Sequence, residues 1–131
     1  MEKAILEFWK THAVFEKTLE QNKDNASFIF YDGPPFATGL PHHGHLLAST
    51  IKDIIPRYQT MNGYHVPRRF GWDCHGLPIE HEINKQFGQS TGEIVSEHGL
   101  AHYNNACRQI IMRYRDEWYQ TIHRIGRWVD F

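Results

Sequence analysis

At 131 residues, with 40% hydrophobic residues, 22% charged residues and a formal net charge of -1, the chain has room for one soluble domain with a modest core. The near-zero net charge excludes a general electrostatic attraction to nucleic acid, and two cysteines exclude a disulfide framework. No stretch approaches the roughly 20 apolar residues that span a bilayer, and no secretory leader is visible, so we expect a cytoplasmic protein without membrane contact.

The first predicted element is an amphipathic helix within residues 1–25, because apolar side chains recur every three or four positions from Ile5 to Leu19. The aromatic run at residues 28–31 predicts a short buried strand. That strand must end before Pro34 and Pro35, which can extend neither a helix nor a β-ladder.

A second helix is predicted to begin near His43 or Gly44 and to stop at Asn62 and Gly63. One face of this helix is expected to hold five apolar side chains: Leu47, Ile51, Ile54, Tyr58 and Met61. Residues 64–70 predict a second strand, so a helix connects two apolar strands. This order is typical of a β-α-β unit with parallel pairing and a right-handed crossover.

The rest of the chain predicts helices. Residues 77–87 favour a short helix that Gly88 closes, and apolar positions along residues 100–125 favour one long helix.

Residues 42–45 read His-His-Gly-His and lie between a Gly/Pro loop and the start of the second helix. A helix N-terminus offers unpaired N–H groups and about half a unit of positive charge, which suits phosphate. His42 and His45 could donate to phosphate oxygens, and Gly44, without a β-carbon, would let a base or ribose approach the backbone. The alternatives are plain helix-start histidines or a metal site, and zinc fits poorly because no third or fourth ligand has the usual spacing.

Three segments together resemble one branch of the class I aminoacyl-tRNA synthetases. Residues 42–45 resemble the HIGH signature of that class, residues 30–41 resemble the strand and loop that precede it in isoleucyl-tRNA synthetases, and residues 71–80 are similar to a segment shared by the isoleucine, leucine and valine enzymes. Small nucleotidyltransferases also carry a HIGH-type signature but lack the third segment. The resemblance covers essentially the whole chain and favours isoleucine over valine.

The resemblance implies an α/β fold, namely the first β-α-β half of a Rossmann-like class I synthetase catalytic domain with flanking helices. Residues 1–131 would be the N-terminal part of that domain. The implied activity of the parent enzyme is the activation of isoleucine with ATP and Mg²⁺, followed by the charging of tRNA(Ile). His42 and His45 would be catalytic and, with Gly44, would bind ATP, and no metal ligands are expected in this part.

The same resemblance assigns the amino acid to Gly33, Pro34 and Asp73. Gly33 and Pro34 would form one wall of its pocket, and the Asp73 carboxylate would pair with its ammonium group, which needs a partner when it is buried. The alternative for Asp73 is a helix cap, although it stands four residues before the expected helix start at Leu77. Cys74 is expected to be a small packing side chain because this reaction needs no covalent enzyme intermediate.

The KMSKS signature, the editing domain and the anticodon-binding domain of the family have no counterpart in these residues. We therefore expect a fragment that is inactive alone, with an exposed strand edge that favours marginal stability or self-association. The alternative function is a non-catalytic, synthetase-derived module that binds nucleotides or other proteins.

Overall fold

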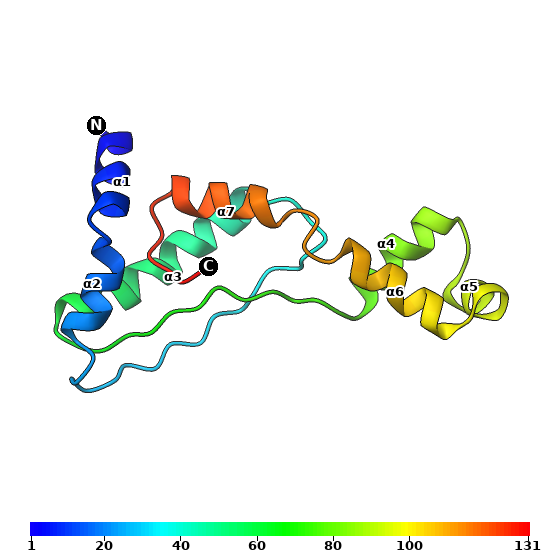
Figure 1. Cartoon of the computed structure of the whole chain (residues 1–131), viewed down its shortest axis with the longest axis horizontal. Helices are drawn as coiled ribbons and strands as arrows, with labels where there is room; N and C mark the ends of the chain where they lie inside the picture. The colour runs from blue at the N-terminus through cyan, green and yellow to red at the C-terminus, as the bar shows by residue number, and fades with distance from the viewer. The chain divides into compact units, whose positions relative to one another are not determined.

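The computed structural model describes every residue from Met1 to Phe131 and contains seven helices (Figure 1). The chain forms two compact units. The first comprises Met1–Gly33, Pro41–Gly71 and Trp118–Phe131, and the second comprises Pro34–Leu40 and Trp72–Glu117. None of the helices combines the length and hydropathy that crossing a membrane requires.

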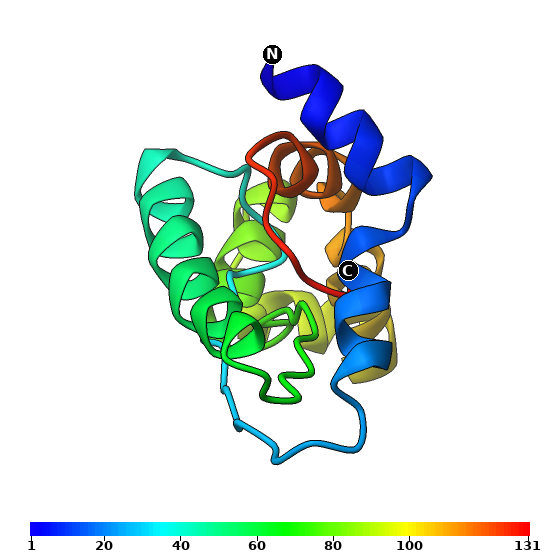
Figure 2. The same cartoon turned by 90° about the vertical axis from the view of Figure 1, so that its left-hand side faces the viewer.

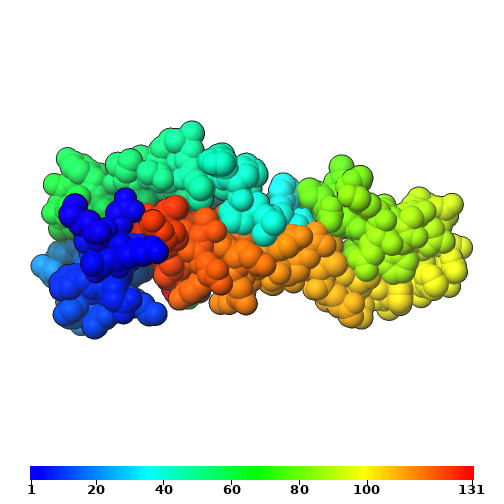
Figure 3. Space-filling view, turned by 90° about the horizontal axis from the view of Figure 1, so that it is seen from above, coloured from blue at the N-terminus to red at the C-terminus, as the bar shows by residue number.

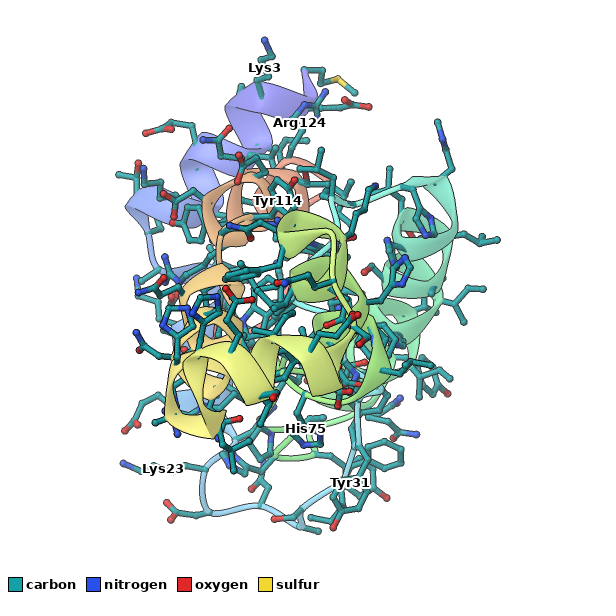
Figure 4. The ribbon with its side chains drawn as sticks, turned by 90° about the vertical axis from the view of Figure 1, so that its right-hand side faces the viewer. Lys3, Lys23, Tyr31, His75, Tyr114 and Arg124 are labelled. Carbon is teal, nitrogen blue, oxygen red and sulfur yellow. The ribbon has the colours of Figure 1, made fainter.

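The N-terminal helix of the first unit is interrupted. It forms α1 (Glu2–Thr11) and α2 (Val14–Gln21), because Ala13 between them adopts a left-handed conformation with φ +47°. The C-terminal residues lie against α1, as the blue and red atoms of Figure 3 show. A β-carbon at Gly126 would stand 3.2 Å from the side chains of Leu6 and Trp9, and Arg124, labelled in Figure 4, donates to Glu2 over 3.2 Å.

Helix α3 (His43–Met61) begins and ends where the sequence predicts, with Asn62 as its C-cap and Gly63 at φ +87°. Ser49, Pro56 and Thr60 are its buried residues, whereas all five side chains of the predicted apolar face are exposed, from 54% for Ile51 to 72% for Met61. The amphipathic pattern therefore predicts the position of the helix correctly, but it does not predict which residues cover the helix.

The predicted α/β fold is wrong, because the chain forms isolated bridges and no sheet. Ser27 pairs in parallel with His65, through hydrogen bonds from Phe28 N–H to His65 O (2.9 Å) and from His65 N–H to Ala26 O (3.0 Å). The two segments continue extended but form no ladder (Figure 1). The supposed buried strand leaves Tyr31 90% exposed, with its ring pointing outward in Figure 4.

The physical reason is the lack of partners. A two-stranded pair is marginal in water, and parallel pairing is the weaker kind. Pro67 also removes an N–H donor from the second segment. Residues 68–70 pair instead with the C-terminal segment, where Phe70 N–H donates to Asp130 O and Asp130 N–H donates to Arg68 O. The β-α-β half of a Rossmann-like domain is therefore not formed, although the two isolated bridges between the segments before and after α3, Ser27 with His65 and Phe36 with Asp73, are parallel.

The core of the first unit gathers around the end of the chain, which passes between helices in Figure 2. Its buried apolar residues are Val66, Phe70, Trp118, Ile122 and Val129. Arg68 is also buried and donates to the neutral oxygens of Pro56, Thr60 and Trp128. Burial lowers the pKa of Arg68 to about 10, so the guanidinium stays charged at pH 7.

The second unit is a small helical cluster of α4 (Leu77–Phe87), α5 (Thr91–His98) and α6 (Leu100–Ile110). Gly88, at φ +68°, ends α4 as predicted. The sequence reading missed α5, which Ser90 and Glu93 start with a reciprocal capping box. The core of this cluster is Ile79, Ile83, Ile94, Tyr103 and Ile110.

The predicted long helix over residues 100–125 is broken in two. Met112 adopts φ +70° after α6, and α7 (Arg115–Arg124) begins three residues later. A left-handed residue cannot continue a right-handed helix, and periodicity alone does not reveal such a break.

Candidate functional site

The start of α3 is held by its own histidines. Gly44 N–H donates to Nδ1 of His42 over 3.1 Å, and His42 N–H donates to Nδ1 of His45 over 3.2 Å. This is the reciprocal capping arrangement that Ser/Thr and Glu usually make. The two rings stack with their centroids 3.6 Å apart.

The capping fixes which ring nitrogen carries the proton. A backbone N–H can only donate, so each Nδ1 must accept, and the proton of each neutral imidazole then resides on Nε2. His42 and His45 therefore present two Nε2–H donors at a helix N-terminus, where the helix dipole also favours negative charge.

His45 is the more enclosed of the two rings. It is partly buried, and its centroid lies 4.8 Å from that of the buried Trp118 ring. Burial, followed by the positive charges of His42 and Lys52, lowers the pKa of His45. The ring is therefore neutral at pH 7 and acts as a hydrogen-bond donor rather than as a cation.

Gly44 is required by the ring next to it. A β-carbon at this position would stand 3.0 Å from Cε1 and 3.2 Å from Nδ1 of His42. Glycine therefore leaves room for the His42 cap, in addition to the close nucleotide approach that the sequence suggests.

Gly33, at the end of its extended segment, is fixed by a residue that sequence reasoning missed. Lys52 of α3 donates to the Gly33 carbonyl over 2.7 Å and lies 2.6 Å from Oδ1 of Asp32. Arg127 pairs with the other Asp32 oxygen. Lys52 follows His45 by two helical turns, so shared helical spacing was the one signal that could have indicated it.

The second unit holds Pro34 and Asp73. Asp73 N–H donates to Pro35 O over 2.8 Å, and Ala37 N–H donates to Asp73 O over 3.0 Å, so Asp73 is paired through its backbone with the loop that Pro34 begins. Ala37 is fully buried, which anchors this loop.

The Asp73 side chain is partly buried, and its carboxylate makes no hydrogen bond or ion pair. The cap of α4 is Gly76, which makes no side-chain cap, so the capping alternative for Asp73 is excluded. Burial and then the charge of Asp73 raise the pKa of Cys74, which keeps that thiol protonated and argues against a nucleophile.

The predicted residues thus fall into two groups. The first unit brings together His42, Gly44 and His45 and holds Gly33, whereas the second unit holds Pro34 beside Asp73. No three His, Cys, Asp or Glu side chains are arranged to hold a metal ion.

Comparison with known proteins identifies the family. The family model described as tRNA synthetases class I (I, L, M and V) matches residues 4–131. The chain is 57% identical over 130 residues to the isoleucine–tRNA ligase of Protochlamydia amoebophila and 56% identical to that of Chlamydia caviae, covering 99% of this chain and 12% of each relative. It is 58% identical to the cytoplasmic isoleucine–tRNA ligase of Mus musculus, covering 10% of that protein. The chain thus spans about a tenth of the length of these relatives. The family match over residues 4–131 includes both groups of candidate residues. The chain therefore belongs to the class I tRNA synthetases for isoleucine, leucine, methionine and valine.

Proposed function

We propose that this chain is the HIGH-side part of an isoleucine–tRNA ligase, in which it binds ATP and part of the isoleucine substrate. In the reaction, a carboxylate oxygen of isoleucine attacks the α-phosphorus of ATP, and the bond to pyrophosphate breaks. Isoleucyl-adenylate forms, and its isoleucyl group is then transferred to a hydroxyl of tRNA(Ile) with release of AMP. Two anions must meet, so the protein has to offset negative charge and fix an in-line approach.

The observation that carries the proposal is the pair of Nε2–H donors at the start of α3. They are held in one tautomer by backbone hydrogen bonds, so they need no reorganisation when charge develops on phosphate oxygens. The lowered pKa of His45 supports a neutral donor, and the N-terminus of α3 adds its dipole.

The amino acid is assigned to Gly33, Pro34 and Asp73. The unpaired, partly buried carboxylate of Asp73 supports a role in binding the substrate ammonium, since such a carboxylate gains most from a charged donor. Mg²⁺ would enter with ATP, as it usually binds substrate phosphates together with water. The proposed compartment is the cytoplasm.

ATP binding by the 131-residue chain tests the nucleotide part. We expect His45→Ala to weaken ATP binding, measured by calorimetry, about tenfold, since one hydrogen bond to a charged group contributes roughly 1.5–3 kcal/mol. His43→Ala is the matched control, because His43 is exposed and stands in the same turn of α3. An equal loss of ATP affinity in both variants, or an ATP affinity that His45→Ala leaves unchanged, would contradict the assignment of His45 to ATP binding.

Isoleucine-dependent ATP–pyrophosphate exchange tests the chemistry. The proposal expects no exchange from this chain alone, because the lysine-bearing second signature that stabilises pyrophosphate is not among its residues. Exchange that requires isoleucine and disappears in His45→Ala would show that these residues suffice for activation.

A further inference from the structure

We infer that Lys52 is a positioning residue that ties the helix carrying the two histidines to the Asp32–Gly33 segment, with Arg127 holding that segment from the other side. The inference rests on the proposed function, in which Gly33 contacts the amino acid and His45 contacts phosphate. It adds that Lys52 fixes the position of Gly33 relative to α3.

Lys52 makes two bonds to consecutive residues. Its Nζ donates to the Gly33 carbonyl over 2.7 Å and lies 2.6 Å from Oδ1 of Asp32. Arg127 pairs with Oδ2 of Asp32 and reaches Ser49 of α3 over 3.4 Å. We call Lys52, Asp32 and Arg127 the clamp.

The segment that the clamp holds has little else to fix it. Residues 29–33 make no backbone–backbone hydrogen bond, because pairing with the second extended segment is confined to two isolated bridges, Ser27 with His65 and Phe36 with Asp73. The bond to Lys52 is therefore the contact that fixes the Gly33 carbonyl. Since Lys52 stands two turns after His45 on α3, it connects the two parts of the proposed site that lie in the first unit.

The clamp is also more enclosed than an ordinary surface ion pair. The side chains of Asp32 and Arg127 are 12% and 5% exposed, and that of Lys52 is 31% exposed. Exposed pairs are weak because water screens them and long side chains lose entropy. Burial raises the pKa of Asp32, but the hydrogen bonds and charges of Lys52 and Arg127 outweigh it and hold this pKa below its usual value.

The test follows the Gly33 amide by NMR in the 131-residue chain. Lowering the pH protonates Asp32, which faces Lys52 and Arg127, and loosens the clamp. The Gly33 amide shift should therefore follow the Asp32 carboxyl titration. In Lys52→Met the response of the Gly33 amide to this titration should become smaller and the Asp32 midpoint should rise, whereas Lys52→Arg should restore both.

Lys17→Met is the matched control, since Lys17 is exposed on α2, makes no ion pair, and loses the same charge and side chain. It should leave the Gly33 and Asp32 signals as in the unchanged chain. A Gly33 amide that behaves alike in Lys52→Met and Lys17→Met overturns the inference, as does a shift that Lys52→Arg fails to recover. The absence of ATP binding that depends on His45 would overturn the proposed function alone, because the Gly33 measurement requires no ligand.

Discussion

At the scale of single residues, the most specific prediction concerns the pKa and the tautomer of His45. Its pKa lies below 6.5 because the ring is partly buried and faces the charges of His42 and Lys52. Imidazole NMR should show an Nε2–H tautomer for both histidines and a His45 midpoint below 6.5. Lys52→Met should raise that midpoint, since it removes a positive charge. A midpoint at or above 6.5 in the unchanged chain would contradict the structure.

The same shift has a consequence for stability. Between pH 6.5 and the lower folded pKa, the unfolded chain binds more protons at His45 than the folded chain does. The contribution of His45 to the free energy of unfolding is therefore complete above about pH 6.5 and is lost as the pH falls through that window. Asp32, whose pKa is also lowered, contributes in the same direction at more acidic pH.

Gly44→Ala separates the histidine cap from the helix itself. The added methyl would stand 3.0 Å from the His42 ring, so the ring must shift by a few tenths of an ångström, which weakens its hydrogen bond from the backbone of residue 44. Alanine also favours a helix by about 1 kcal/mol over glycine, so we expect little net change in the free energy of unfolding. ATP affinity should fall about threefold to tenfold because one donor is displaced.

Gly92→Ala is the control for that substitution. Gly92 occupies the same second position of its helix, α5, and a β-carbon there would meet nothing within 4 Å. It should raise the free energy of unfolding without affecting ATP affinity. Calorimetric titration and urea unfolding of the two variants measure both quantities, and an unchanged ATP affinity in Gly44→Ala would count against His42 as a ligand.

At the scale of elements, the break between α1 and α2 stores strain that a substitution can release. Ala13 adopts φ +47°, which costs an L-residue roughly 1–2 kcal/mol. Ala13→Gly should stabilise the chain by roughly 0.5–1 kcal/mol, after allowing for the entropy that glycine loses on folding. Ala48→Gly, on the exposed side within α3, should instead destabilise it by about 1 kcal/mol. If urea unfolding shows that both substitutions change the free energy of unfolding in the same direction, a left-handed break at Ala13 is excluded.

What could be predicted from the sequence was mostly local. The limits of α3 and α4 follow from Asn62, Gly63 and Gly88, whose effect depends on neighbouring residues. The breaks at Ala13 and Met112 were not predictable, because neither residue favours a left-handed conformation and tertiary packing imposes it. The sheet was wrongly predicted because strand pairing needs partners that a short apolar run does not guarantee.

The candidate site shows the same difference between local features, which the sequence predicts, and long-range contacts, which it does not. The histidine pattern and Asp73 could be proposed from the sequence because their chemistry lies within a few consecutive residues. The clamp was not, because Arg127 and Asp32 are 95 positions apart and only the folded chain brings them together. Lys52 and Gly33 are 19 positions apart, which is also beyond the range of a helical or strand period.

At the scale of the whole molecule, the least usual feature is the apolar stripe along α3, the teal-to-green helix on the left of Figure 2. The stripe consists of Leu47, Ile51, Ile54, Tyr58 and Met61, each more than half exposed. These residues repeat at the spacing of one helix face, so they form a continuous surface rather than scattered exposed side chains. Contiguous apolar surface of this kind favours association with other molecules.

We therefore expect the chain to self-associate through this stripe at high concentration. Ile54→Lys places a charge in the middle of the stripe and should shift sedimentation velocity toward the monomer, because burying an unpaired ammonium is costly. Leu100→Lys is the matched control, since Leu100 is 61% exposed and Ile54 60%, and Leu100 belongs to α6 of the second unit rather than to α3. If the unchanged chain sediments as a monomer at about 100 μM, or if both variants change the distribution equally, association does not use this face. Because the stripe lies on the same helix as the two histidines, a monomeric Ile54→Lys chain that still binds ATP would also show that the nucleotide residues act within one copy.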